Sequence, residues 1–181
     1  MLINRVSDGL MGENNSAFVA FYTDPVRIYD GADSLPESLW TLEIPLLGAV
    51  LRWDGSVGLV GGEVEPSESL IDAAIRESYE EVGYEPAKDS LKLVCSHSMV
   101  SPSRPQNTHL FACKVSMHLM YEIRMRACNS RHGQSESAGF NVLHMNSQTI
   151  ENLPLMHWAG TALSEVRILL TQGIIAPARQ G

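Results

Sequence analysis

Residues 62–84 read GEVEPSESLIDAAIRESYEEVGY, a stretch dense in carboxylates that leads into a glycine. Glu77, Glu80 and Glu81 stand at positions i, i+3 and i+4, so a helix would carry them on one face within about one turn. Like charges at this spacing destabilise a bare helix. A divalent cation changes that balance, because Mg²⁺ binds carboxylate oxygens and keeps water and substrate phosphates as its other ligands. The segment therefore predicts a metal site for phosphate chemistry.

The spacing of this stretch is more specific than its carboxylates alone. Glu68 follows Gly62 after five residues, and Arg76 follows after seven more. The whole pattern resembles the Nudix box, G-x5-E-x7-R-E-U-x-E-E-x-G-U with U an apolar residue, and every fixed position matches. Ser78 departs from it, since an aliphatic residue is expected there, and Tyr84 is a loose match for the last U. Ser78 is expected to face the core side of the helix, where it affects packing and leaves the chemistry intact.

The resemblance to the Nudix family implies both a fold and a reaction. The implied fold is an α/β/α sandwich with a mixed β-sheet, formed by residues 1–181 as one domain. The implied reaction is hydrolysis of a nucleoside diphosphate linked to another moiety, in which water attacks phosphorus with Mg²⁺ or Mn²⁺ bound. A second hypothesis is a catalytically inactive Nudix-fold module that binds a nucleotide or a protein. Such relatives usually lose box glutamates, and none is missing here.

The same resemblance assigns roles to the residues of the box. It implies that Glu80 and Glu81 are the principal metal ligands, and that Glu77 is a further ligand or the base that activates water. Arg76 would orient a catalytic glutamate, for which its guanidinium fork is suited. Glu68 would belong to an outer shell, either as a distant ligand or as a structural partner of Arg76.

Other site residues are expected outside the core of the box. Gly61 would offer its carbonyl oxygen to the metal, and Gly62 would let the backbone turn sharply. Glu136, in the sequence His-Gly-x-x-Glu, is the candidate for a further metal ligand, with Glu122 as the second choice. Arg52 precedes the turn before the box and is a candidate contact for a phosphate or a base, although an exposed strand end would look the same.

The flanks resemble one branch of the family, the small nucleolar RNA decapping and inosine diphosphatase enzymes. The resemblance is carried by residues 51–55 (LRWDG), 108–114 (THLFACK) and 153–175, together with His132-Gly133 followed by Glu136 and Gly139-Phe140. Glu63 is a departure, because that branch tends to carry an aromatic residue there that would stack on a base. The substrate therefore stays open among purine nucleoside di- and triphosphates, ADP-ribose, dinucleoside polyphosphates and capped RNA.

Composition is that of an ordinary soluble globular protein, with 181 residues, 44% of them hydrophobic and 19% charged. The three cysteines show no metal-ligand spacing, so we expect them to be reduced and the protein to be intracellular, in the cytoplasm. The first 17 residues contain no apolar run long enough for a signal peptide or a membrane span. A homodimer is expected only by analogy with the family.

The net charge of −8 is distributed unevenly along the chain. Residues 61–85 hold eight acidic side chains and one basic one, whereas residues 104–131 hold five basic and one acidic. Bound cations would reverse the local field around the acidic segment. Arg124, Arg126 and Arg131 are candidates for tracking an RNA backbone, although arginines near a helix end are commonly ordinary surface residues. The charge therefore does not exclude a nucleotide or a capped RNA.

Local patterns predict strands interrupted by two main helices. The principal helix is expected to begin near Ser67 or Ser69 and to end at Gly83, with the three metal-site glutamates facing away from the deepest core. His109, in a predicted strand, is read as a core histidine rather than a ligand. Strands are predicted at residues 16–23, 45–53, 56–60, 91–100, 108–117 and 139–145, helices at 119–127 and 159–172, a loop at 30–37, and turns at 24–25, 54–55 and 101–105.

Overall fold

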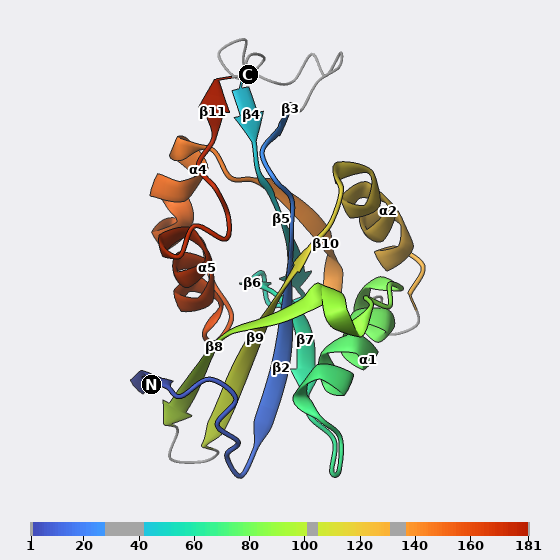
Figure 1. Ribbon diagram of the computed structural model, residues 1–181, viewed down its shortest axis with the longest axis vertical. Helices are drawn as coiled ribbons and strands as arrows, with labels where there is room; N and C mark the ends of the chain where they lie inside the picture. The colour runs from blue at the N-terminus through green and yellow to red at the C-terminus, as the bar shows by residue number, and fades with distance from the viewer. Residues whose placement is uncertain (1, 28–41, 101–104, 131–136, 181) are drawn as a thin grey trace.

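A mixed β-sheet runs through the middle of the protein, and helices cover both of its faces (Figure 1). The computed structural model describes residues 2–27, 42–100, 105–130 and 137–180. The sheet consists of β1 (Leu2–Val6), β2 (Asn15–Tyr22), β5 (Leu46–Arg52), β6 (Val57–Gly58), β7 (Val60–Glu63), β8 (Leu91–Val100), β9 (Gln106–Lys114) and β10 (Ser137–His144). Its order is β1-β8-β9-β2-β5-β10, with β6 paired to β5 and β7 paired to β2. The pairing of β2 with β9 is parallel and the other pairings are antiparallel, so the sheet is mixed as predicted.

The helices are divided between the two faces of the sheet. On one face lie α1 (Leu70–Val82) and α2 (Met117–Ala127), and on the other lie α4 (Ser147–Asn152) and α5 (Ala162–Thr171) (Figure 1). Short 3-10 helices occur at η2 (Lys88–Ser90) and η3 (Leu153–Leu155). A separate small sheet joins β3 (Val26–Arg27), β4 (Leu42–Ile44) and β11 (Arg179–Gln180). This arrangement is the α/β/α sandwich that the sequence predicted.

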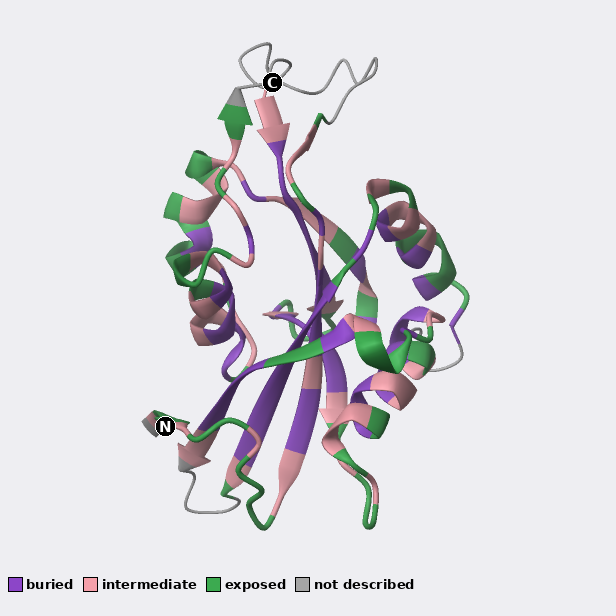
Figure 2. Cartoon of the chain, in the orientation of Figure 1, coloured by how far each residue is buried: buried purple, intermediate pink, exposed green. Residues whose placement is uncertain are grey.

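The central strands are apolar on both faces because helices cover both (Figure 2). Along β9, Phe111 belongs to the hydrophobic cluster that includes Ala74 of α1, and its neighbour Leu110 belongs to the cluster that includes Leu169 of α5. Successive residues of a strand point to opposite faces, which explains this division. The two helical layers are therefore packed on the sheet through separate cores.

Helix α1 has the ends that the sequence predicted. Ser69 is its N-cap, and the Ser69 side chain accepts a hydrogen bond from the Asp72 amide. The helix ends at Gly83, which adopts a φ of 65° that glycine tolerates well. Ser78 is fully buried, as expected, and its hydroxyl donates to the Ala74 carbonyl at 2.7 Å. This bond satisfies the hydroxyl at the position where the Nudix pattern has an aliphatic residue.

Three predicted boundaries are wrong, each for a local reason. The return strand expected at 56–60 is split, since β6 pairs with β5 while β7 crosses to pair with β2. The strand expected to reach residue 117 ends at Lys114, because Ser116 caps α2. The helix expected from residue 159 begins at Ala162, after Gly160 takes a φ of 51°.

Several elements were not expected from the sequence, namely β1, β3, β4, α4 and β11. The predicted loop at 30–37 and most of the turn at 101–105 lie outside the described residues. Cys95, Cys113 and Cys128 are all free thiols. In the part of the chain that the structure describes, no helix has both the length and the apolar character to cross a bilayer.

Candidate active site

The site begins where β7 passes α1. Gly61 pairs with Phe18 of β2 and has a φ of 141°, and a Cβ added there would lie 2.1 Å from the Ala17 carbonyl oxygen. Only glycine is compatible with both constraints. The Gly61 amide donates a hydrogen bond to Glu81 Oε2 at 2.9 Å. The glycine therefore brings the backbone close enough to hold the Glu81 carboxylate.

Gly62 makes room for a second carboxylate. A Cβ on Gly62 would lie 2.6 Å from Glu77 Oε1, so the Glu77 carboxylate packs directly against the glycine. Glu77 and Glu81 are only 9% and 6% exposed. The paired glycines thus give Glu77 and Glu81 a buried place against the sheet, although neither residue belongs to the hydrophobic clusters of the core. Glu80 is partly exposed, as expected.

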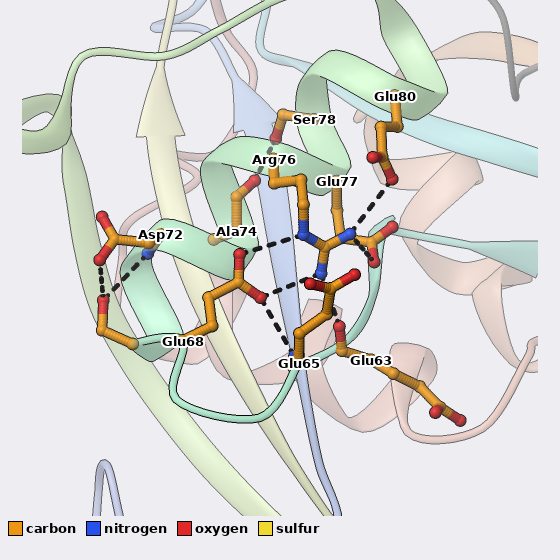
Figure 3. Close-up of polar contacts among 10 residues, drawn as sticks. Glu63, Glu65, Glu68, Asp72, Ala74, Arg76, Glu77, Ser78 and Glu80 are labelled. Atoms are coloured by element: carbon orange, nitrogen blue, oxygen red, sulfur yellow. Dashed lines mark hydrogen bonds and ion pairs between the residues drawn. The ribbon is translucent and has the colours of Figure 1, made fainter.

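Arg76 lies at the centre of the carboxylates (Figure 3). Its Nε and Nη2 donate to the two oxygens of Glu68 at 3.0 and 3.1 Å. Its Nη1 donates to Glu77 Oε1 at 2.8 Å and to Glu80 Oε2 at 3.1 Å. Nη2 also donates to the Glu63 carbonyl at 2.8 Å. One guanidinium therefore holds three side chains of the box and ties them to the end of β7.

These contacts set the charge state of the cluster. Hydrogen bonds from Arg76 lower the pKa of Glu68, and the same bonds to Glu68 and then Glu77 raise the pKa of Arg76. The guanidinium thus stays charged and offsets the repulsion that a bare row of glutamates would have. Of the two placements left open for Glu68, the structure has it as the partner of Arg76.

The carboxylates face a common cavity of 490 Å³. It is lined by Phe18, Arg52, Gly61, Gly62, Glu63, Glu77, Glu80 and Glu81. The structure thus brings together the three predicted glutamates, the glycine pair and the two flanking candidates Arg52 and Glu63. Within the described ranges, however, no three His, Cys, Asp or Glu side chains are arranged to hold a metal ion. In this arrangement, Arg76 binds oxygens of Glu77 and Glu80, and the Gly61 amide binds an oxygen of Glu81.

The remaining candidates lie elsewhere or are not described. Glu136 falls outside the described residues, as does Arg131. Glu122 is on α2, where it pairs with Arg126 at 3.3 Å and with His118 at 3.2 Å, and it does not line the carboxylate cavity. His109 is fully buried, and its Nδ1 lies 2.8 Å from the Ser96 hydroxyl. It is the core histidine that the sequence predicted.

A second cavity, of 380 Å³, was not expected from the sequence. It shares Phe18 and Arg52 with the carboxylate cavity, and Glu165 of α5 is among its lining residues. A signal was present, since Glu165 stands three residues after Ala162 and four before Leu169, on the apolar stripe of the helix. A charged residue on a buried stripe marks a polar site inside the fold.

The family comparison agrees with this geometry. Residues 44–126 match the family model described as the NUDIX domain. A curated relative, the U8 snoRNA-decapping enzyme of Homalodisca vitripennis, is 34% identical over 92 residues, which cover 49% of this chain and 48% of the relative. The chain thus spans about half the length of the curated relative it matches. Both resemblances drawn from the sequence are confirmed.

Solved structures share the fold at low sequence identity. The NUDIX domain of Shewanella oneidensis NrtR, in complex with ADP ribose, aligns with a TM-score of 0.60 and 13% identity over 90% of each chain. The Bacillus subtilis pyrophosphohydrolase BsRppH aligns with a TM-score of 0.56 and 13% identity over 96% of this chain and 92% of that chain. At these identities the likeness extends to the fold alone.

Proposed function

We propose that this protein is a divalent-metal-dependent pyrophosphohydrolase that cleaves a pyrophosphate bond in a nucleoside diphosphate linked to another moiety. The observation that carries the proposal is the cavity in which Glu77, Glu80 and Glu81 meet the Gly61-Gly62 backbone. Three partly buried carboxylates that lie this close together are typical of a site that binds a hard cation.

The donor set fits Mg²⁺ or Mn²⁺. Both cations prefer oxygen ligands, and the cavity supplies three carboxylates beside the Gly61 backbone. Glu80 is the most accessible of the three, and Glu81 is the one already held by the backbone. Glu80 and Glu81 would hold the cation once Glu80 turns away from Arg76. The bound metal would neutralise phosphate charge and lower the pKa of bound water.

The protein's own residues complete the chemistry. Glu77 is buried and fixed by the Arg76 guanidinium, so its carboxylate is held in one orientation to accept the proton of the attacking water. Arg52 lines the carboxylate cavity and would bind a phosphate group of the substrate. Phosphoryl transfer needs mainly positioning and charge neutralisation, which this cluster provides. Glu68 acts through Arg76 and has no direct contact with the substrate.

The substrate class is drawn from the relatives. The match to a U8 snoRNA-decapping enzyme supports capped RNA as a substrate beside the small nucleotides, and Arg124 and Arg126 are exposed on α2, where they can contact a phosphate backbone. Reversing the charge of both arginines separates the two classes. The variant would cleave free nucleotides normally and lose activity on capped RNA. Equal cleavage of capped RNA by the variant and the wild type removes the RNA-tracking role.

A second candidate function is nucleotide binding without turnover. It is favoured by the Arg76 contacts, which engage Glu77 and Glu80 so that no ready metal group forms among the described residues. The NUDIX domain of Shewanella oneidensis NrtR was solved with ADP ribose, which is an example of a ligand bound on this fold. A single clear turnover of any nucleotide eliminates this second candidate.

The test is a panel of nucleotides and capped RNA incubated with the protein and Mg²⁺ or Mn²⁺. We expect product from at least one substrate, and a loss of at least about 100-fold in kcat/KM for Glu80→Gln and Glu81→Gln, or about 2.7 kcal/mol of barrier. Glu85→Gln is the matched control, since Glu85 is exposed and does not line the carboxylate cavity. Thermal melting of each variant shows whether the fold is intact. Wild-type activity in both box variants would overturn the proposal.

A further inference from the structure

A buried carboxyl group lies away from the proposed metal site. Glu165 is 1% exposed and projects from α5 into the second cavity. Burying a carboxylate is costly unless a cation or hydrogen bonds compensate. The nearest cationic candidate is His97 of β8, whose Nδ1 lies 4.0 Å from Glu165 Oε1, beyond hydrogen-bond distance. Among the residues that the structure describes, Glu165 thus has no cationic group within hydrogen-bond distance.

The hydrogen bonds of Glu165 are one-sided. The Thr161 hydroxyl donates to Oε1 at 2.8 Å, and the Thr108 hydroxyl lies 3.3 Å from the same oxygen. The two threonine hydroxyls are 3.1 Å apart. No hydrogen bond from the described part of the chain reaches Oε2. One oxygen is therefore fixed by the protein, which leaves the other for a ligand in the cavity.

The titratable groups around Glu165 leave its charge adjustable. Burial raises the pKa of Glu165 to about 7. On β8, burial lowers the pKa of His97 and raises the pKa of Cys95 to about 12, so both neighbours are uncharged at neutral pH. The cavity walls add three further groups at the mouth, which are Arg52, Asp54 and His157. A carboxyl group in a cleft whose pKa lies near neutral pH is typical of a functional site.

The second cavity is placed to receive the base of a nucleotide. It shares Phe18 and Arg52 with the carboxylate cavity, so one ligand can extend from one cavity into the other. Its volume of 380 Å³ lies within the range of small-molecule sites. Trp158 lines the wall, and its indole N–H donates to the Leu153 carbonyl at 2.7 Å, which fixes the ring. An aromatic wall with a polar floor is the chemistry that recognises a nucleobase.

We propose that Glu165 determines base specificity, with Oε2 accepting hydrogen bonds from the N–H groups on the Watson–Crick edge of the substrate's base. Guanine presents two adjacent donors on that edge, hypoxanthine presents one, and adenine places an acceptor nitrogen beside its amino group. An acceptor facing a carboxylate is left unpaired in a buried site, which lowers affinity. The expected order of preference is guanine, then hypoxanthine, then adenine. This role of Glu165 rests on the proposed function in one respect, which is that the phosphates of the substrate bind at the carboxylate cavity.

The experiment measures binding of GMP, IMP and AMP by calorimetry at pH 8, where Glu165 is ionised. These monophosphates contain no anhydride bond, so the measurement does not depend on turnover. We expect the wild type to bind GMP at least about tenfold more tightly than AMP. Glu165→Gln is expected to bring that ratio within about threefold, because its amide can donate to adenine as well as accept from guanine. Glu151→Gln, an exposed change on α4, is the control and keeps the wild-type ratio.

A second measurement needs no substitution at all. The GMP to AMP ratio of the wild type is expected to fall as the pH is lowered from 8 to 6, since protonation of Glu165 removes the acceptor. The phosphate groups of the two ligands titrate alike and cancel in the ratio. Equal binding of GMP and AMP at pH 8, or a ratio unchanged in Glu165→Gln, would overturn the proposal. Selective binding without hydrolysis of any diphosphate defeats the proposed function alone, whereas hydrolysis without base preference defeats the role of Glu165 alone.

Discussion

The carboxylate cavity and the second cavity both contain buried carboxyl groups, yet they stabilise them in opposite ways. At the carboxylate cavity, the Gly61 amide binds Glu81 and the Arg76 guanidinium binds Glu77 and Glu68, and the bonds from Arg76 lower the pKa of Glu68. In the second cavity, Glu165 has only threonine hydroxyls, and burial dominates, so its pKa rises to about 7. The contrast shows that the hydrogen-bond donors around a carboxyl group decide whether it stays ionised at neutral pH or titrates near neutral pH.

The largest expected effect on the carboxylate cavity comes from a substitution at one of its glycines. Gly61→Ala would push a Cβ to within 2.1 Å of the Ala17 carbonyl and would also strain a φ of 141°, so we expect a loss of about 3 kcal/mol or more in unfolding free energy. Urea denaturation measures it. Gly139→Ala is the control, because Gly139 has a φ of 149° and open space around it. Similar losses in the two variants would show that close approach to Ala17 is unimportant.

Removing the guanidinium tests how the first cavity keeps its charge. Arg76→Met leaves Glu68, Glu77 and Glu80 without their shared donor, and we expect kcat/KM to fall about 10- to 100-fold. Arg76→Lys retains the charge and cannot bridge three carboxylates, so its loss should be smaller than that of the methionine variant. Steady-state kinetics on any accepted substrate measures both. A lysine variant as impaired as the methionine variant would mean that geometry matters and charge does not.

The second cavity is tested by the pH dependence of stability. The pKa of Glu165 is raised from an ordinary value of 4.5 to about 7, so the folded protein binds the proton more tightly than the unfolded chain does. The contribution of Glu165 to the free energy of unfolding is largest below pH 4.5, declines as the pH rises toward 7 and is constant above that. Glu165→Gln should therefore raise Tm by about 4 °C or more at pH 8 and change it little at pH 4.5. A gain that is the same at both pH values would show that Glu165 does not titrate in this window.

The opposite sign is expected for Glu68. Hydrogen bonds from Arg76 lower its pKa, so its stabilising contribution is present at neutral pH and is lost as the pH falls through the folded-state pKa. Because Glu68 is partly exposed, solvent screening reduces the effect, and Glu68→Gln should lower Tm by about 2 °C at pH 7 and less at acid pH. Thermal melts at several pH values check it. Equal losses of Tm at pH 7 and at acid pH would show that the charge of Glu68 does not contribute to stability.

The smallest expected effect is that of metal on stability. Mg²⁺ at about its dissociation constant adds about 0.4 kcal/mol to the free energy of unfolding, and EDTA removes this gain. The gain should disappear in Glu80→Gln combined with Glu81→Gln and persist in Glu165→Gln, because the two cavities act separately. A gain that survives in the double variant would place the cation elsewhere.

The sequence predicted the first cavity far better than the second. Box residues are fixed by local spacing on one helix, and the glycine pair precedes it directly in the chain, so Gly61, Glu77 and Glu80 could be placed together without a structure. What spacing missed was the burial of Glu77 and Glu81, because it depends on β7 pairing with β2 rather than continuing the hairpin.

Glu165 could not be placed because its neighbours come from distant parts of the chain. Thr108 lies on β9 and Phe18 on β2, and only the order of strands in the sheet brings them beside α5. The short strands β1 and β4 were missed for a similar reason, since their pairing partners are remote in sequence. Local patterns predicted the chemistry that one helix carries, and tertiary packing created the rest.

The most direct single measurement is hydrolysis in water enriched with ¹⁸O, followed by mass spectrometry of the phosphate products. The panel of nucleoside diphosphate compounds and capped RNA is incubated with Mg²⁺ or Mn²⁺, and Glu80→Gln and Glu81→Gln serve as paired controls. We predict that one phosphorus-containing product gains a single ¹⁸O atom per turnover in the wild type and that this product is absent in both variants. An absence of labelled product from every substrate with the wild-type protein would contradict the proposed hydrolysis.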